Sequence, residues 1–324
     1  MGIKSLGNNN ITYTAVWDKT GVGAIDPPVH PVISWGGNRG VYMGGWTDIE
    51  VNTIDYIDIK TTGNATDFGD TLNVIEAPAC CSNGTRGIGM CGSEQATRFN
   101  TIQYITFATP SNSTDFGDCS SQKNGCGALS NGSRGVVAGG DNSGTFNVIE
   151  YVTIDTTGDT TDFGDLTQSK EGLGGMGGDT RGIFFGGKSG GSRVNVMEYI
   201  TIATTGNAID FGDLNEDLSL IGGASDKTRG VMGGGRDSGG SAVNVIQYVT
   251  VATPSNSTDF GDLLSNNRSN GCAGNYDRVV WGGGYNNSAQ VNTIQYVTTQ
   301  TTGDATDFGD LTNSRRSAGG SSGD

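Results

Sequence analysis

The sequence predicts an all-β protein made of six similar units of four strands each, and three observations carry this prediction. The tetrad Asp-Phe-Gly-Asp returns every 47 to 49 residues, beginning at residues 67, 115, 162, 210, 259 and 307. An arginine and a tyrosine keep the same spacing in every unit. Gly accounts for 56 of the 324 residues and Pro for only 6, while Ile, Val, Phe and Tyr fall in short runs. This composition favours short strands joined by tight turns.

Each unit contains the signals for four strands. In residues 166–213 we expect strands near Leu173–Met176, Gly182–Phe185, Val194–Ile202 and Ala208–Phe211. The turns between them supply Gly, Asn and Asp, which adopt positive φ at little cost. The third strand is apolar on both faces, as expected for a strand between two packed sheets. Four-stranded units that pack face to face at this period predict a six-bladed β-propeller.

The two ends of the chain predict the domain organisation. Residues 1–36 depart from the repeat and hold the only proline cluster, so we expect an N-terminal extension that anchors the propeller of residues 37–324 to a neighbouring protein. The C-terminal "LTNSRRSAGGSSGD" resembles the segments that lead into an innermost strand in other units. We therefore expect the last residues to supply the innermost strand of the first blade and so close the ring. Residues 31–35 are the competing candidate for that strand.

Three repeated positions are interpreted as structural. The phenylalanine of each tetrad is expected to fill the gap between two blades, and the glycine after it to let the chain leave the outer strand. The residue before each repeated tyrosine is Asp, Glu or Gln, so a hydrogen-bond acceptor is kept while charge is not. The phenylalanines are Phe68, Phe116, Phe163, Phe211, Phe260 and Phe308, and the repeated arginines are Arg39, Arg86, Arg134, Arg181, Arg229 and Arg278.

The tetrad does not predict a metal or cofactor site. Asp-Phe-Gly binds magnesium in protein kinases, but a kinase also needs a phosphate-binding loop, a strand lysine and a catalytic His-Arg-Asp, all of which this chain lacks. For the twelve tetrad aspartates we expect hydrogen bonds to turn amides, or pairing with the repeated arginines, over calcium binding. A zinc site is not expected, because the six cysteines show no paired spacing and His30 is the only histidine.

Charge and the N-terminus restrict the partners. The 34 acidic and 19 basic residues give a net charge of −15, which repels nucleic acid and anionic lipid. We see neither a secretory signal nor an apolar run that could span a bilayer, so we expect synthesis in the cytoplasm and no membrane insertion. N-myristoylation is not expected, because Leu6 stands where the acceptor pattern requires Ser or Thr.

The repeat resembles that of Kelch proteins in a Gly-Gly pair that ends the second strand, a tyrosine in the third strand and an aromatic residue in the fourth. Phenylalanine stands where Kelch repeats have tryptophan, and Cys91-Gly92 replaces one glycine pair. The wording "NVIEYVTI", "TTG" and "TDFGDL" is similar to tandem repeats of structural proteins in marine tailed-phage virions. This resemblance implies a virion location as part of a fibre, tail or head decoration. The implied partners are other virion proteins, a host surface receptor or glycan, or further copies of the chain.

No unit carries an odd cluster of His, Tyr, Arg and carboxylates, so we expect a non-enzymatic binding protein. A propeller that binds or cleaves carbohydrate stays open as the alternative. The loops between the second and third strands differ most among the units, and they should emerge beside the connections between blades. We expect recognition at this face, because binding residues concentrate on loops that a rigid scaffold positions. Simple tolerance of sequence drift is the alternative. The expected contact residues, all aromatic or arginine, are Trp46, Phe99, Arg193, Arg236 and Tyr285.

Overall fold

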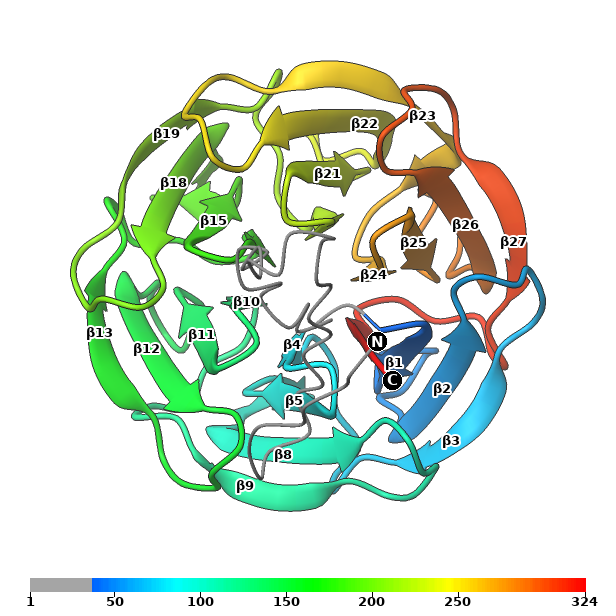
Figure 1. Cartoon of the computed structure of the whole chain (residues 1–324), viewed down its shortest axis with the longest axis horizontal. Coiled ribbons are helices and arrows are strands. Elements are labelled where there is room, and N and C mark those ends of the chain that lie inside the picture. Colours follow the sequence, from blue (N-terminus) through cyan, green and yellow to red (C-terminus); the bar gives the residue numbers. More distant parts are fainter. Residues whose placement is uncertain (1–36) are drawn as a thin grey trace, which may run out of the picture. The chain divides into compact units, whose positions relative to one another are not determined.

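The computed structural model describes residues 37–324, which form the six-bladed β-propeller that the repeat predicts (Figure 1). Each blade is a four-stranded antiparallel sheet, and its four strands lie one after another from the central axis to the outer edge. No helix in this part of the chain is long and apolar enough to cross a membrane. The anchor expected in residues 1–36 lies outside the described residues.

We name the blades A to F in chain order and give their strands from the innermost to the outermost. Blade A has β28 (Gly319–Gly323), β1 (Arg39–Met43), β2 (Thr53–Asp58) and β3 (Thr66–Asp70). Blade B has β4 (Ala79–Ser82), β5 (Arg86–Met90), β8 (Thr101–Thr106) and β9 (Thr114–Asp118). Blade C has β10 (Gly127–Ser130), β11 (Arg134–Ala138), β12 (Val148–Thr153) and β13 (Thr161–Asp165).

Blades D to F follow the same plan. Blade D has β14 (Gly174–Gly177), β15 (Arg181–Phe185), β18 (Val196–Thr201) and β19 (Ile209–Asp213). Blade E has β20 (Gly222–Ser225), β21 (Arg229–Gly233), β22 (Val243–Thr250) and β23 (Thr258–Asn267). Blade F has β24 (Gly271–Gly274), β25 (Arg278–Gly282), β26 (Thr293–Thr298) and β27 (Thr306–Asp310). Short pairs β6 (Ser93–Glu94) with β7 (Thr97–Arg98), and β16 (Lys188–Ser189) with β17 (Ser192–Arg193), lie in two loops.

The strands expected in residues 166–213 match those of blade D to within two residues at every end. The prediction of ring closure is also confirmed. β28 pairs antiparallel with β1, from Arg39 opposite Gly323 to Met43 opposite Gly319, so the last residues of the chain complete its first blade. The ends of the domain are therefore held by a full ladder of backbone hydrogen bonds.

The hydrophobic core is divided into six clusters, one between each pair of neighbouring blades. Phe163 of blade C, for example, packs with Phe184, Ile200 and Ile202 of blade D, and it is only 2% exposed. Every tetrad phenylalanine lies in such a cluster, and its ring meets the repeated tyrosine of its own blade edge-on at 5.8–6.0 Å. Burial of these rings holds each blade against the next.

The repeated arginines also join the blades, but the expected pairing with the tetrad aspartates is wrong. Arg134 stacks on Tyr151 at 4.4 Å and donates a hydrogen bond of 3.0 Å to the carbonyl of Ile202 in blade D. All six arginines repeat this arrangement, including Arg278, which bonds to blade A across the seam. In the described chain no hydrogen bond or ion pair reaches the tetrad carboxylates. The nearby ring face and carbonyl therefore satisfy the guanidinium in their place.

The tetrad glycine lies inside the outer strand, and the expectation that it marks the end of the strand is wrong. Gly69 has φ of 142° at a bulge of β3, and a Cβ there would lie 2.6 Å from the Ser111 carbonyl carbon of blade B. Its absence lets the turn of the next blade approach, and the Asn112 side chain then accepts the N–H of Asp70 at 3.0 Å. The same bond recurs at all six blade contacts.

The acceptor before each repeated tyrosine behaves as expected. It is buried in the third strand of its blade and accepts the N–H two residues after the preceding tetrad. Whether the acceptor is acidic or neutral depends on the residue that lies three positions after this N–H donor in the connection. Acidic acceptors form buried ion pairs, whereas glutamines face uncharged residues. The ion pairs are Asp55–Arg315, Glu150–Lys123 and Glu198–Lys170, and at the same register Gln103, Gln247 and Gln295 accompany Ile75, Leu218 and Asn267.

Candidate binding site on the loop face

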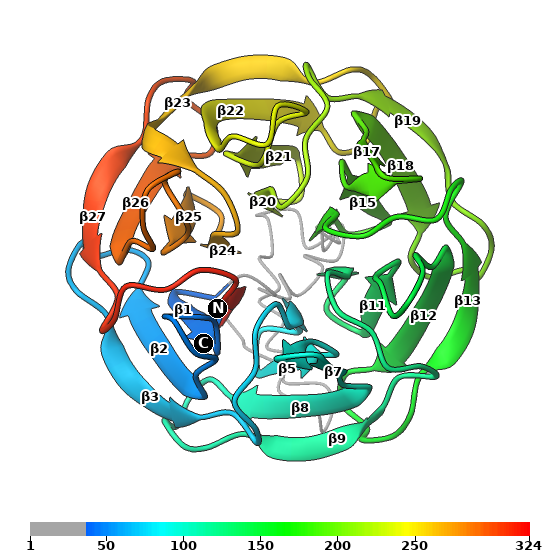
Figure 2. The ribbon, with the colours of Figure 1, turned by 180° about the vertical axis from the view of Figure 1, so that it is seen from behind.

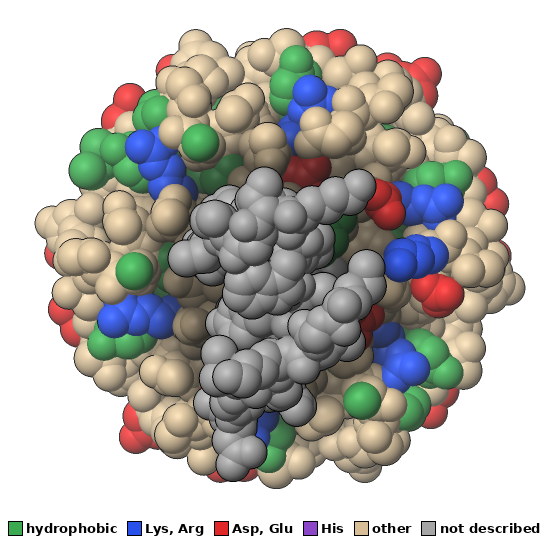
Figure 3. Space-filling view, viewed as in Figure 1, with side chains coloured by type: hydrophobic (Ala, Val, Ile, Leu, Met, Phe, Trp, Pro, Cys, Tyr) green, Lys and Arg blue, Asp and Glu red, His purple; other side chains and the backbone are tan. Residues whose placement is uncertain are grey.

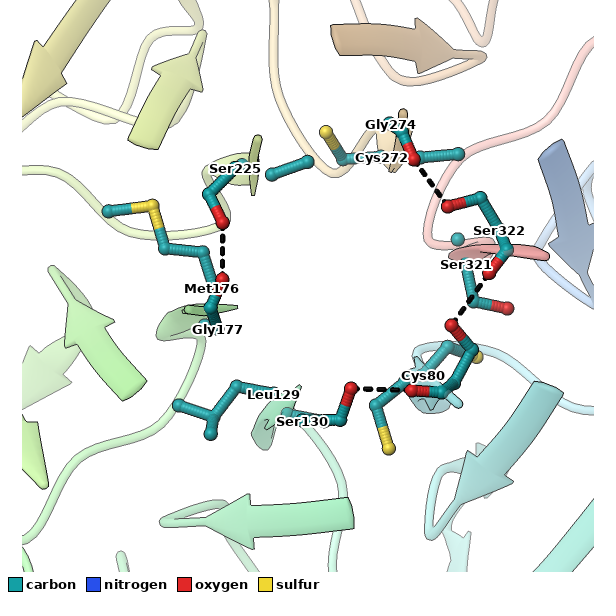
Figure 4. A pocket seen from close by; sticks show the side chains of 18 of the residues that line it. Cys80, Leu129, Ser130, Met176, Gly177, Ser225, Cys272, Gly274, Ser321 and Ser322 are labelled. Atoms are coloured by element: carbon teal, nitrogen blue, oxygen red, sulfur yellow. Dashed lines mark hydrogen bonds between the residues drawn. The ribbon is translucent and has the colours of Figure 1, made fainter. Parts of the chain in front are cut away.

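The innermost strands leave a narrow channel of about 100 Å³ along the propeller axis. Serine hydroxyls at one register of these strands bridge neighbouring blades, as Figure 4 shows. The Ser82 hydroxyl donates to the carbonyl of Ser322 at 2.6 Å, and Ser130 donates to Ser82. Ser322 and Ser225 donate in the same way to Gly274 and Gly177. These four hydroxyls therefore join neighbouring blades and belong to the scaffold, whereas the Ser321 hydroxyl in the same channel has no hydrogen-bond partner among the described residues.

The two ends of the propeller differ in what they expose. One end carries the turns between strands one and two and between strands three and four, and we call it the turn face. The other carries the loops between strands two and three together with the connections between blades, and we call it the loop face (Figure 2, where β7 and β17 are labelled). Single backbone bridges join each connection to the first residue of a loop, for example Arg316 to Trp46 and Arg268 to Tyr285.

A ring of backbone hydrogen bonds underlies the loop face. One residue in each connection has φ between 53° and 65°, and in every connection except that of Gly125 its N–H donates to the previous connection. Leu220 donates to Gly172 at 2.7 Å, Ser269 donates to Leu220 at 2.9 Å, and Ser317 donates to Ser269 at 2.7 Å. This ring holds the residue that precedes each such position at the rim of the channel. Those residues are Glu76, Asn124, Glu171, Ser219, Arg268 and Arg316.

The rim encloses a cavity of about 410 Å³. Two of the five residues expected to form contacts line it, and two more stack on arginines of its wall. Arg193 and Arg236 line this cavity directly. Trp46 and Tyr285 support two further arginines of its wall: Arg316 stacks on Trp46 at 4.2 Å, and Arg268 stacks on Tyr285 at 4.8 Å. The side chains come from the loops of blades A, D, E and F.

Phe99 is the exception, because it neither lines the cavity nor stacks on an arginine of its wall. Its N–H closes the loop by donating to the carbonyl of Gly92 at 2.9 Å. Its counterparts in the other blades make the same bond, and all but one of them are valines. Phe99 therefore occupies a repeated structural position at the end of its loop.

Sequence reasoning missed Arg268 and Arg316 because it considered only the loops. Both lie on connections, immediately before the positive-φ residues Ser269 and Ser317. A signal was present, because this position is Glu, Asn, Ser or Arg in different units. The position before it changes in charge as well, so the sequence did not separate the rim residue from the buried partner of the strand acceptor.

The arginines of the cavity wall repel one another, because their like charges lie close together. Burial, together with the positive charge of Arg236, lowers the pKa of Arg193, although Asp237 opposes the shift. Burial and the charges of Arg236 and Arg316 likewise lower the pKa of Arg268. Elsewhere on the wall, Lys188 neutralises Glu171 through an ion pair of 3.2 Å. The wall of the cavity carries five basic and two acidic residues in all.

The cysteines are free and lie in the scaffold. Cys80 and Cys272 are in the innermost strands, as expected for small packing residues, and Cys91 lies with its Sγ 3.1 Å from that of Cys119. Burial raises the pKa of Cys81 to about 12, so that thiol stays protonated. Within residues 37–324 no three His, Cys, Asp or Glu side chains converge as a metal site. No family model and no curated protein matches this chain in sequence comparisons.

Proposed function

We propose that the chain is a non-enzymatic structural and binding protein of a bacteriophage particle, with a Kelch-like propeller that presents its loop face to a partner protein or to the host surface. The division between the two faces is the observation that supports this function. Six equal sets of contacts hold the turn face, whereas the loop face gathers side chains that differ between blades. A rigid scaffold with one variable face is suited to recognition. The phage assignment rests on the resemblance of the repeat to virion proteins.

Mass spectrometry of purified particles tests the location. We expect the chain at a fixed copy number per particle, retained through density-gradient purification. Its absence from particles produced by cells that express it would contradict the phage assignment and leave the binding role to be tested separately.

Replacement of the loops tests the binding face. We expect a variant with all six loops between strands two and three shortened to Gly/Ser turns to keep its fold and to lose partner binding. The double variant Trp46→Ala/Tyr285→Ala, which leaves the loop backbones intact, should weaken binding in the same direction. The matched control is the double variant Lys60→Ala/Thr62→Ala, which changes two exposed side chains of the turn face. Unchanged binding by folded loop variants would contradict recognition at this face.

A carbohydrate-binding or carbohydrate-cleaving propeller is the second candidate, favoured by the carboxylates in the wall of the cavity. Hydrolysis of a glycosidic bond needs one protonated and one ionised carboxyl group. Burial raises the pKa of Glu76, while Glu171 lies in an ion pair with Lys188. Binding on a glycan array without cleavage would support a lectin-like role. Release of reducing ends, lost in Glu76→Gln, would replace the non-enzymatic proposal.

A further inference from the structure

The cavity of the loop face holds four arginines that form no ion pair among the described residues. Arg193, Arg236, Arg268 and Arg316 come from a sector that runs from blade D through blades E and F to blade A. Within residues 37–324 none of them has an acidic partner within 4 Å. Elsewhere in the described chain, buried charges are matched one to one, as in the pair Glu198–Lys170. The repeated interblade arginines also lack acidic partners, but each of them donates a terminal N–H to a backbone carbonyl. The four cavity arginines differ in that their terminal donors are not used in this way.

The arginines are held in place without using their terminal donors. Arg316 and Arg268 rest on Trp46 and Tyr285 through the faces of their guanidinium groups, which leaves the in-plane N–H groups free. Arg193 donates only its Nε–H, to Ser219 Oγ at 3.1 Å, and Arg236 donates only its Nε–H, to the carbonyl of Gly240 at 2.9 Å.

The N–H groups that make no hydrogen bond belong to guanidinium groups whose orientation the protein already fixes. The Nε of Arg268 is buried and has no hydrogen-bond partner among the described residues. The terminal nitrogens of all four guanidinium groups likewise have no acceptor in the described chain. Planar, oriented forks of this kind match the oxygens of carboxylate, sulfate and phosphate groups, which they bind through paired hydrogen bonds.

The size of the cavity and the charge of the whole chain limit the ligand. A volume of about 410 Å³ lies in the range of small-molecule sites, about 300–1,000 Å³. The net charge of −15 repels a long polyanion that would extend beyond the arginine sector. A compact anion, or a single anionic group at the end of a longer molecule, avoids that repulsion.

We propose that the arginine sector of the loop face binds a compact ligand that carries at least two oxyanionic groups. This inference deepens the proposed function, on which it rests, by naming the chemistry that the loop face recognises. Arg236 is the first residue of the loop of blade E, and Arg268 lies on the connection from blade E to blade F. Both line the cavity, so we take them as the central donors. Arg193 and Arg316 flank them.

Isothermal titration calorimetry of the full chain at low ionic strength tests this site. The probes are citrate for carboxylates, pyrophosphate for phosphates, and trehalose as an uncharged control. We expect saturable binding of citrate or pyrophosphate that weakens as sodium chloride is added, and no binding of trehalose. The preferred probe distinguishes the two anion chemistries. No heat from either anion at millimolar concentration would overturn the proposal.

Matched variants separate a specific site from general charge attraction. Arg268→Gln and Arg236→Gln should each weaken anion binding by roughly tenfold or more, because each removes charge-assisted hydrogen bonds. Lys60→Gln removes the same charge from an exposed position of the turn face and should leave the affinity unchanged. Arg236 lies on a loop, so its variant stays informative if Arg268→Gln fails to fold. Equal weakening by Lys60→Gln would overturn the site.

The result is independent of the tests of the proposed function. Anion binding lost in Arg236→Gln, together with unchanged partner binding after loop replacement, would support the site and contradict recognition by the loop face. Partner binding that needs the loops, together with no anion binding, would support recognition by the loop face and contradict the anion site.

Discussion

The turn face and the loop face of this propeller are built on the same twenty-four blade strands, yet they differ in how strictly the sequence repeats. On the turn face every blade carries an arginine stacked on a tyrosine at 4.3–4.9 Å, and every arginine reaches a carbonyl of the next blade. Figure 3, which has the view of Figure 1, shows these blue and green side chains side by side around the ring. On the loop face the six rim positions, one in each connection, hold Glu, Asn, Ser or Arg. Repetition is thus kept where side chains join blades and is lost where they face the cavity.

The strict repetition on the turn face indicates that the contacts between blades are the repeated unit of stability in this fold. Each contact uses the same phenylalanine cluster, arginine bridge and clamp from a turn side chain to a tetrad amide. The seam between blades F and A is no exception, since Asp310 N–H donates to Asn64 and Arg278 donates to Ile59. A side chain that takes part in none of these contacts is free to change.

Removal of residues 313–324 should have the largest effect. It deletes β28 and the buried partner of Asp55, and it opens the ring at blade A. Domains of this kind are stable by only about 5–15 kcal/mol, so we expect the cooperative thermal transition to be lost. Circular dichroism during heating measures this, and a synthetic peptide of the same residues should restore part of the transition. An unchanged melting temperature would mean that another segment closes the ring.

The buried ion pairs provide a sharper test, because the chain contains its own controls. Lys170→Leu or Glu198→Gln alone leaves one buried charge unmatched and should destabilise the fold by about 3–5 kcal/mol in urea unfolding. The double variant recreates the Leu218 and Gln247 pair of blade E and should be close to the parent in stability. Additive losses in the double variant would show that the two positions are not coupled.

A pair of single substitutions compares the two faces directly. Arg134→Gln removes a stacked cation and an interblade hydrogen bond, so we expect a loss of about 1–2 kcal/mol. Arg236→Gln, the same chemical change on the loop face, should alter the free energy of unfolding by less than about 0.5 kcal/mol. Urea titrations of both variants measure the difference. Equal losses would remove the distinction between scaffold and binding surface.

The sequence was sufficient for the architecture because the information was repeated six times. The spacing of the tetrads, the alternation of glycine-rich turns with apolar runs and the match between the C-terminal segment and other strand-leading segments predicted blade number, strand positions and ring closure. The roles of individual repeated residues were harder to predict. The sequence predicts turn amides or the repeated arginines as partners of the tetrad aspartates, because opposite charges attract, whereas the fold places a tyrosine ring and a backbone carbonyl beside each arginine. The tetrad glycine was read as the end of a strand, although a neighbouring blade explains it.

The fold, the closing strand and the face at which the units differ can be predicted without the structure, because they follow from local periodicity and short-range strand patterns. Which of the varied residues meet depends on the closed ring. Arg268 and Arg316 lie on connections, far along the chain from Arg193 and Trp46, and only the closed ring brings them to one cavity. The pairing of acidic acceptors with Lys123, Lys170 and Arg315 became visible in the same way. Contacts between blades depend on the curvature of the ring, which no single repeat contains.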